Sequence, residues 1–378
     1  MFSLHIDTAA TWRGGQNQVL LTVLGLRERG ERAMLVAHPD GELRRRVEEG
    51  LELVPLAPGH ELDLKAAWKL ARVVRRVRPD IVHAHDPHGV AMASMALSML
   101  TTTPSPRLVA ARRVDFHLKR NSFSKWKYRQ VDLFIASSEA IRRILMRDGV
   151  PGDQIVTVHE GIDVERIGRL PTINLHEQFF LPHNAPIVGN VAALVAHKGQ
   201  RHLINAVPLV LREMPDTRFV ILGEGPLRAT LEHQIKALHL EKHVVMPGFR
   251  DDVLSCIKAF DLFVMSSETE GLGTSLLDAM AAGKPTIGTD VGGIPEAIDD
   301  RVSGLIVPPN DPASLARAIV KLLKDDALAT RMGHAGLARA RRQFSVETMV
   351  AGTIEAYRRL VPKLKDEGRE TGDERTGS

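Results

Sequence analysis

The chain has 378 residues, of which 44% are hydrophobic and 25% are charged, and its formal net charge is +4. This length favours two globular domains, because single hydrophobic cores stop growing near about 250–300 residues. A single cysteine, Cys256, excludes an internal disulfide and a cysteine-based metal cage, and its apolar surroundings indicate a packing role. The start lacks a signal-peptide pattern and no apolar run reaches ~18 residues, so we expect a cytoplasmic protein.

Short apolar runs alternate with amphipathic stretches through the first half of the chain. This alternation predicts parallel strands joined by helices. One helix is expected from Leu62 to Val77, where apolar residues recur at helical spacing. The predicted strands are SLHID, AMLVA, LELVP, DIVHAH, RLVAA, LFIAS and IVTVH. Together they predict a doubly wound, Rossmann-like α/β domain over residues 1–165.

The pattern dissolves between Gly161 and Pro186, where prolines interrupt a loop-like sequence. It returns with IVGNVAAL, RFVILG, HVVMPG, DLFVMS, KPTIGT and SGLIVPP, which predict a second Rossmann-like domain over residues 166–345. A C-terminal helix that can cross back to the first domain is expected at 346–362, and a disordered tail at 363–378. Two such domains imply a ligand cleft at the carboxyl ends of their strands.

The most informative stretch follows the strand DLFVMS and includes the loop 270–274, EGLGT. A helix is predicted to begin near Ser275. Glycines let backbone N–H groups approach a ligand closely, and the positive end of a helix dipole favours phosphate. Glu270 lies before this anion site and Asp278 one helical turn into it. One carboxylate can therefore bind sugar hydroxyls and the other ribose hydroxyls, an arrangement that suits a nucleotide sugar.

Each acid also has a purely structural explanation. Asp278 could complete a capping arrangement with Ser275, which lies three residues earlier. Glu270 could be a solvated loop acid. Their occurrence together favours the binding role.

With EGLGTSLLDAM and TDVGGIPEAI, the chain resembles the retaining GT-B-fold glycosyltransferases of family 4, the group 1 glycosyltransferases. Their hallmark is a Glu, seven residues, a second Glu and a DVGG-x-PE stretch; here the second acid is Asp278. The resemblance implies two Rossmann-like domains facing each other across a deep cleft. It also implies sugar transfer from a UDP- or GDP-sugar with retention of configuration, with no cofactor and no bound metal.

Further motifs match the family in the expected order. Lys198 in GNVAALVAHKGQRHLI fits a phosphate-binding lysine, whereas Ala193 stands where the family usually has an arginine. A lone lysine neutralises only part of a diphosphate, so Arg201 or a group of the first domain would have to compensate. Other matches are VILGEGPLRATL, MPGFRDDV and a Gly-Gly loop after the first strand. The resemblance implies these donor-binding residues: Gly14, Gly15, Gly223, Gly225, Arg250, Gly271, Leu272, Gly273, Thr274 and Asp278.

Histidines and charged residues follow two strands of the first domain, at the expected cleft. His85, Asp86 and His88 in HAHDPHG are expected to orient the acceptor, together with Arg113. These ligand types also suit a metal ion, but no DxD pair is evident in the sequence, and we expect no bound metal. In ARRVDFH, the counterpart of the family's histidine near the donor sugar is left open between Arg113, Asp115 and His117.

In this family, retention is usually explained by front-face substitution, in which the leaving diphosphate helps to deprotonate the acceptor hydroxyl. The catalytic candidates are Glu270, which would fix the donor sugar, Lys198 and Asp115. Alternatives with the same fold are a nucleotide-sugar epimerase and a non-catalytic sugar-nucleotide binding protein. A nicotinamide-dependent oxidoreductase is disfavoured because the GEG at 223–225 lacks the third glycine, at Arg228.

Basic residues gather between Arg112 and Arg129, interleaved with aromatic residues. This composition suits an anionic membrane surface, a phosphorylated lipid or a nucleic acid strand, and a solvated helix face is the alternative. We expect peripheral contact with the inner face of the plasma membrane through residues 112–129, and no nucleic-acid partner. A glycan or lipid-linked acceptor from bacterial surface polysaccharide or lipopolysaccharide synthesis would fit.

Overall fold

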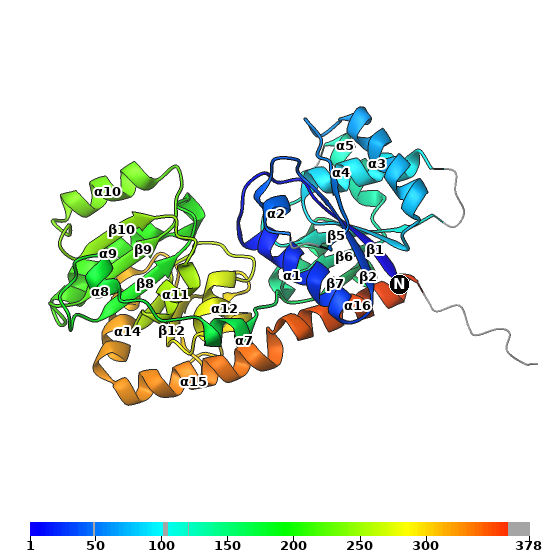
Figure 1. Ribbon diagram of the computed structural model, residues 1–378. Coiled ribbons are helices and arrows are strands. Elements are labelled where there is room, and N and C mark those ends of the chain that lie inside the picture. Colours follow the sequence, from blue (N-terminus) through cyan, green and yellow to red (C-terminus); the bar gives the residue numbers. More distant parts are fainter. Residues whose placement is uncertain (48–49, 101–104, 120, 362–378) are drawn as a thin grey trace, which may run out of the picture.

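The structure is a computed structural model that describes residues 1–47, 50–100, 105–119 and 121–361. The expected disordered tail at 363–378 and position 362 of the expected C-terminal helix lie outside these residues. Two lobes lie side by side, each built around one parallel sheet (Figure 1). The predicted architecture of two Rossmann-like α/β halves is therefore confirmed.

The first sheet has the strand order β3-β2-β1-β4-β5-β6-β7, and its paired strands are parallel. Separate apolar clusters cover its two faces, which is why its central strands read as nearly continuous apolar runs. Its strands are β1 (Phe2–Asp7), β2 (Arg32–Ala37), β3 (Leu53–Pro55), β4 (Ile81–Ala84), β5 (Arg107–Arg112), β6 (Leu133–Ala136) and β7 (Ile155–Thr157). Its helices are α1 (Gly14–Glu28), α2 (Glu42–Arg45), α3 (Leu64–Val77), α4 (Pro87–Ser98), α5 (Ser122–Arg129) and α6 (Glu139–Arg147).

The second sheet has the order β10-β9-β8-β11-β12-β13 and is also parallel. Cys256 is buried in its core, as its apolar surroundings predicted. The strands are β8 (Ile187–Val191), β9 (Arg218–Leu222), β10 (Val244–Gly248), β11 (Leu262–Met265), β12 (Thr286–Thr289) and β13 (Leu305–Val307). The helices are α9 (Gln200–Leu211), α10 (Arg228–Ala237), α11 (Val253–Lys258), α12 (Thr274–Ala281), α13 (Ile294–Ala297), α14 (Pro312–Lys324) and α15 (Asp326–Gln343).

The connection between the sheets is not the plain loop that its prolines predicted. It contains two short helices, α7 (Val164–Arg169) and α8 (Leu175–Gln178). The side chains of Asp163 and Asn174 accept hydrogen bonds from backbone N–H groups one turn into these helices. Apolar residues of both helices then pack into the core of the second lobe, which compensates for their short length.

The last two helices carry the chain back to the first lobe. Helix α15 runs along the second lobe, and α16 (Val346–Leu360) lies against the first sheet and α1 (Figure 1). Val350 and Tyr357 of α16 belong to the same apolar cluster as Val19 and Val23 of α1. The C-terminal helix therefore completes the core of the first lobe. The limits of the two domains, at residues 165 and 345, stay a prediction.

The carboxyl ends of the strands in both sheets open onto one cleft of about 1120 Å³. Residues of both lobes line it, as expected for tandem open α/β sheets. Among the helices formed by the described residues, none combines the length and apolar character needed to cross a bilayer.

Candidate active site

The predicted site residues converge on the cleft, with two exceptions. Gly225 and His88 do not line it, whereas the other predicted donor, acceptor and catalytic residues do. At Gly225 an added Cβ would lie 2.4 Å from the carbonyl oxygen of Leu194, so this glycine allows two loops to pack closely. The side chain of His88 is exposed beside the cleft.

Lys198 and Glu270 form an ion pair inside the cleft. The Nζ of Lys198 lies 2.6 Å from Oε2 of Glu270, and Ser267 donates a second hydrogen bond of 3.0 Å to the same oxygen. Only 9% of the Glu270 side chain is exposed, so solvent screens this pair weakly. The two catalytic candidates of the second lobe therefore hold each other in place, and the charge of Lys198 is largely offset by its partner.

The starts of helices α1 and α12 meet across the cleft. An added Cβ on Gly14, the first residue of α1, would lie 2.7 Å from Oγ1 of Thr274, the first residue of α12. Gly273 precedes α12 with a φ of 91°, a conformation that favours glycine. Two positive helix ends are thus directed toward one region, which suits a phosphate group.

Asp278 does not cap the helix, so the capping interpretation is wrong. Gly273 occupies the position before α12, and the hydroxyl of Ser275 donates to the carbonyl oxygen of Val191 at 2.8 Å. Burial, and to a smaller extent the nearby carboxylate of Glu160, raise the pKa of Asp278 to about 7. Near neutral pH this side chain can both donate and accept hydrogen bonds.

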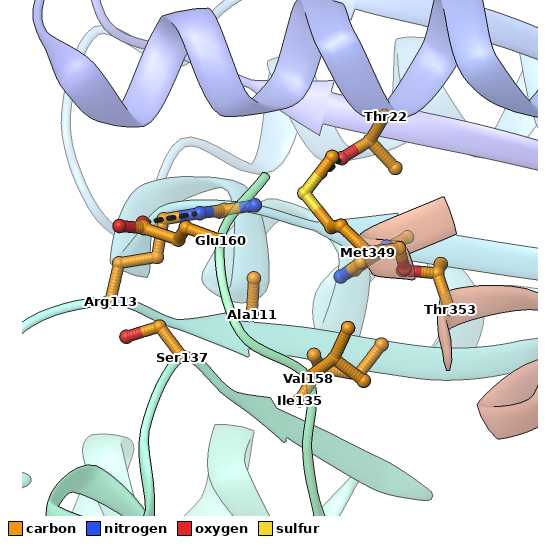
Figure 2. A pocket seen from close by; sticks show the side chains of 10 residues that line it. Thr22, Ala111, Arg113, Ile135, Ser137, Val158, Glu160, Met349 and Thr353 are labelled. Carbon is orange, nitrogen blue, oxygen red and sulfur yellow. Dashed lines mark hydrogen bonds and ion pairs between the residues drawn. The ribbon is translucent and has the colours of Figure 1, made fainter. Parts of the chain in front are cut away.

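Glu160 is a site residue that the sequence analysis missed. It lies just beyond β7, and its Oε1 is 3.4 Å from Nε of Arg113, the residue after β5 (Figure 2). Burial raises the pKa of Glu160 to about 7; Glu270 raises it too, while Arg113 and Lys198 lower it. The signal was available, because an acid directly after the strand IVTVH lies at the carboxyl edge of the sheet.

A cavity of about 20 Å³ lies behind this ion pair. Its lining includes His83, Ser137 and Thr353 of α16. His83 Nε2 and Ser137 Oγ are buried without hydrogen-bond partners among the described residues. A cavity of this size has room for one water molecule, which could satisfy such groups.

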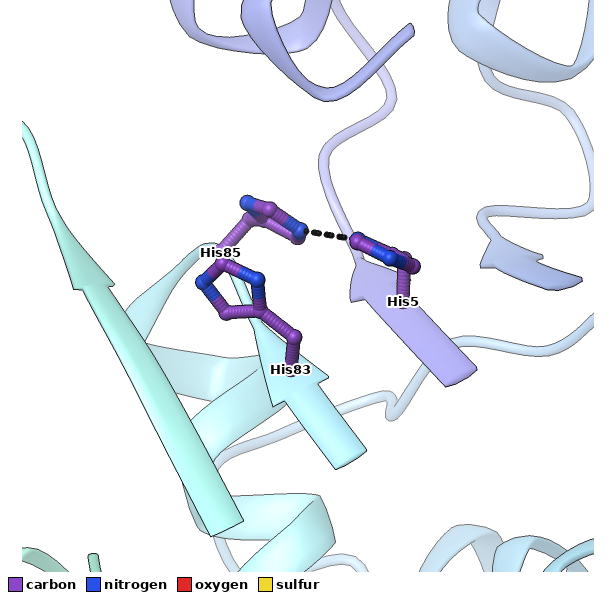
Figure 3. Close-up of side chains that lie close together, drawn as sticks. All are labelled: His5, His83 and His85. Atoms are coloured by element: carbon purple, nitrogen blue, oxygen red, sulfur yellow. Dashed lines mark hydrogen bonds between the residues drawn. The ribbon is translucent and has the colours of Figure 1, made fainter. Parts of the chain in front are cut away.

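Three buried histidines lie together near Arg113, and two of them are hydrogen-bonded to each other. His5 Nδ1 and His85 Nε2 are 2.9 Å apart (Figure 3), and Nη1 of Arg113 lies 3.1 Å from His85 Nδ1. His83 Nδ1 pairs with the hydroxyl of Tyr357 at 2.6 Å. Burial lowers the pKa of His5 to about 3, and it lowers the pKa values of His83 and His85 well below the ordinary value. The imidazoles are therefore neutral.

The ring nitrogens of His5, His83 and His85 lie close enough together to hold a metal ion. However, Arg113 and His5 occupy both ring nitrogens of His85, and the guanidinium charge opposes a cation there. The geometry therefore favours a hydrogen-bonded chain that orients Arg113. It also leaves His85 no free nitrogen for an acceptor unless one of these bonds breaks.

Asp86 is engaged in local structure at the start of α4. Its side chain accepts hydrogen bonds from the backbone N–H and hydroxyl of Thr8 and from the N–H groups of His88 and Gly89. Such a cap stabilises a helix by about 1 kcal/mol. A direct acceptor contact by Asp86 stays a prediction.

The structure narrows the three candidates in ARRVDFH. His117 pairs with Asp148 at 2.6 Å and does not line the cleft. Arg113 and Asp115 both line it. No ion pair of Asp115 occurs within the part of the chain that the structure describes, so its carboxylate is available in the cleft.

Two other predicted donor residues have defined surroundings. Gly223 has a φ of 136°, and an added Cβ would lie 2.0 Å from the carbonyl oxygen of Ala192. Only glycine fits there. Arg250 pairs with Asp252 and hydrogen-bonds Gln178 at 3.0 Å, which holds its guanidinium at the edge of the cleft.

Comparison with known proteins connects this geometry to an enzyme family. The model for Glycosyltransferase Family 4 matches residues 12–166, and that for Glycosyl transferases group 1 matches residues 172–339. The N-acetyl-alpha-D-glucosaminyl L-malate synthase of Bacillus anthracis is 29% identical over 76% of this chain and 77% of its own length. A GDP-mannose-dependent mannosyltransferase that acts on phosphatidylinositol monomannoside, from Mycolicibacterium smegmatis, is 34% identical over 47% of this chain and 49% of its own length.

Solved structures show the same architecture. The HepE protein of Anabaena in complex with UDP-glucose has a TM-score of 0.80 at 21% identity, covering 94% of this chain and 98% of the other. The sucrose-phosphate synthase of Thermosynechococcus elongatus has a TM-score of 0.78 at 19% identity, covering 96% and 99%. The matches run through both lobes and their shared cleft: the chain belongs to the group 1 glycosyltransferases of family 4, which have the GT-B fold.

Proposed function

We propose that this glycosyltransferase moves a sugar from a nucleotide-sugar donor to a glycan or lipid-linked acceptor, with retention of configuration and without a metal ion. The ion pair of Lys198 and Glu270, beside the facing starts of α1 and α12, carries the proposal. It brings a cation and a hydroxyl-binding carboxylate together beside one anion site. The relatives support a UDP- or GDP-linked donor, because one is named GDP-mannose-dependent and one was solved with UDP-glucose.

The donor would span the cleft of the second lobe. Its diphosphate would lie at the helix starts, its sugar hydroxyls would contact Glu270, and its ribose hydroxyls would contact Asp278. An aspartate is shorter than the glutamate usual in the family. Its partly protonated state compensates, since it can bond a hydroxyl as donor or as acceptor.

In the proposed reaction, the bond from the anomeric carbon to the diphosphate oxygen breaks while the acceptor oxygen bonds to the same face. The proton of the acceptor hydroxyl passes to the leaving diphosphate. The chain contributes position and charge. Glu270 fixes the sugar, Lys198 and backbone N–H groups stabilise the leaving group, and Asp115 orients the acceptor together with Arg113.

A sugar-transfer assay with UDP- and GDP-linked donors tests the proposal. The wild type should transfer from one donor class, with equal rates in the presence and absence of a chelator. Glu270→Gln keeps the shape of the side chain but removes its charge, and we expect kcat/KM to fall on the order of 10²-fold. The matched control is Glu232→Gln, at an exposed position on α10 outside the cleft, which should retain wild-type transfer.

The alternatives predict different products. An epimerase would isomerise the donor when no acceptor is present. A sugar-nucleotide binding protein would bind the donor tightly, with neither transfer nor slow hydrolysis. Either result, or full activity of Glu270→Gln, would contradict the proposed reaction.

Peripheral contact with an anionic membrane is the second part of the proposal. Within residues 112–129, the side chains of Arg112, Arg113 and Lys127 turn inward, and Lys127 pairs with Glu61 at 2.6 Å. The segment alone therefore presents less charge than its sequence suggests.

Helices α3 and α5 both pack against α4, and α3 adds exposed basic residues together with exposed Leu64 and Trp68. We define the basic surface as Lys65, Lys69, Arg72, Lys119, Lys125 and Arg129.

A further inference from the structure

The diphosphate position has little positive side-chain charge of its own. Lys198 is the cation of the phosphate-binding motif, and Glu270 offsets its charge at 2.6 Å. Position 193 holds an alanine, so this loop supplies no second cation. The helix starts contribute only partial charges, about half an elementary charge each. A nucleoside diphosphate that leaves with its full negative charge therefore calls for another cation.

Most cations of the cleft are already paired. Arg46 pairs with Asp251, Arg113 with Glu160 and Arg250 with Asp252. Arg112 is buried and donates to the backbone carbonyl of Phe116. Apart from this buried Arg112, the arginines that line the cleft without an acidic side chain within 4 Å, among the residues described, are Arg13 and Arg166.

Arg13 adjoins the phosphate region, whereas Arg166 belongs to a different element of the cleft lining. Arg13 directly precedes Gly14, the α1 residue that meets Thr274 at the start of α12. Its side chain is exposed to the cleft solvent, so binding a ligand would not require breaking an internal ion pair. Arg166 lies on α7, in the connection between the lobes, and does not adjoin either helix start along the chain.

We propose that Arg13 supplies the second positive charge to the leaving diphosphate. It would replace, from the opposite lobe, the arginine that is missing at position 193. The proposal rests on the proposed transfer reaction. As the bond between the anomeric carbon and the diphosphate oxygen breaks, the guanidinium donates two parallel hydrogen bonds to phosphate oxygens. The acceptor proton still goes to the diphosphate. Because Lys198 and Arg13 belong to different lobes, the complete charge assembles only where the lobes meet.

A set of four variants tests this role: Arg13→Gln, Arg13→Lys, Arg166→Gln and the double variant Arg13→Gln/Ala193→Arg. Calorimetry measures the affinity for the nucleoside diphosphate that the wild type prefers and for the matching nucleoside, and an assay measures kcat/KM. Arg13→Gln should lower kcat/KM on the order of 10²-fold and weaken the diphosphate without changing the nucleoside. Arg13→Lys should give values between those of Arg13→Gln and the wild type. Arg166→Gln should stay within about twofold of wild type, because Arg166 also lacks an acidic partner among the described residues but does not adjoin either helix start along the chain.

The double variant provides the decisive result. An arginine at position 193 restores a cation to the loop that carries Lys198, so it should recover a large part of the lost diphosphate affinity and kcat/KM. A merely structural role of Arg13 would not be rescued from the opposite lobe. Wild-type behaviour of Arg13→Gln, an equal loss in Arg166→Gln, or an equal loss of nucleoside affinity would overturn the proposal. A wild type that binds no nucleoside diphosphate would instead contradict the proposed function.

Discussion

Burial sets the charge state of the acids in the cleft more than any single partner does. Desolvation is the largest cause that raises the pKa values of Asp7, Glu160 and Asp278, to about 6, 7 and 7. Glu270 differs because Lys198 and Ser267 both stabilise its carboxylate. The cleft thus contains buried acids that take up protons near neutral pH beside a carboxylate held in an ion pair with Lys198, which separates their chemical roles.

At the residue scale, the raised pKa of Asp278 predicts a pH-dependent stability. The folded protein holds this proton up to about pH 7, whereas an unfolded aspartate loses it near pH 3.8. Between these values the folded state binds more protons, so the free energy of unfolding falls as pH rises. Asp278→Asn removes this titration. We expect the decline in stability between pH 5 and pH 8 to be smaller in the variant than in the wild type, as measured by denaturant unfolding.

Glu160 titrates in the same range and repels Asp278, so the two acids release protons as a coupled pair. Glu160→Gln in the Asp278→Asn background should flatten the remaining slope further. An unchanged slope in both variants would mean that neither acid holds a proton in the folded state.

At the scale of elements, the contact between α1 and α16 ties the end of the chain to the first lobe. An added Cβ at Gly25 would lie 2.6 Å from Cγ2 of Val350. We expect Gly25→Ala to lower the free energy of unfolding by about 1–2 kcal/mol through overpacking. In a Val350→Ala background the same change should be neutral or stabilising, because the obstructing methyl group is gone.

The control for this packing prediction is Gly168→Ala on α7. No heavy atom lies within 4 Å of the added Cβ there, so helix propensity alone predicts a gain of about 0.5–1 kcal/mol. Equal effects at Gly25 and Gly168 in unfolding experiments would show that the contact with α16 is not tight.

The exposed faces of α3 and α5 predict binding to anionic vesicles. Replacement of Lys65, Lys69 and Arg72 by Gln should weaken cosedimentation with phosphatidylglycerol vesicles at low salt, since each basic residue near such a surface contributes about 1 kcal/mol. A matched loss of three charges on α15, at Arg331, Arg341 and Arg342, should have little effect. Equal losses in both sets, or equal binding to neutral vesicles, would rule out a specific basic surface.

At the scale of the whole molecule, the proposed donor site is shared between two lobes. Gly14 and Arg13 come from the first lobe and Lys198 and Thr274 from the second, while α16 returns to complete the first core. Substrate binding and the relative position of the lobes are therefore linked. A ligand that contacts both lobes stabilises the state in which they are properly placed.

This linkage predicts that one nucleoside diphosphate among UDP, GDP and ADP raises the melting temperature of the protein. The panel also includes the monophosphate CMP. A ligand present at about 100 times its Kd adds about 2.7 kcal/mol to the free energy of unfolding. We expect the same shift with a chelator, because Lys198, Arg13 and the helix starts provide the positive charge. A shift that vanishes with the chelator would contradict metal independence.

The sequence by itself determined the architecture, and it predicted a donor site whose residues, apart from Gly225, line the cleft. Alternating apolar runs predicted the strands of both sheets, since burial on both faces of a parallel sheet requires apolar residues in unbroken runs. The EGLG loop and Lys198 were identifiable because their chemistry depends on local spacing along one loop and one helix start. Short helices between Gly161 and Pro186 were missed because their stability comes from capping and distant packing.

Only the tertiary structure decided which charges act together. The pair of Arg113 with Glu160, the histidine chain beneath it and the contact of Gly14 with Thr274 join residues that are far apart in sequence. It also showed that Asp86 caps α4 and that Lys127 forms an ion pair with Glu61. Arg13, in contrast, keeps its charge available at the cleft. Ion pairing, desolvation and helix dipoles act through distances of a few ångströms in space, and the order of residues along the chain does not contain those distances.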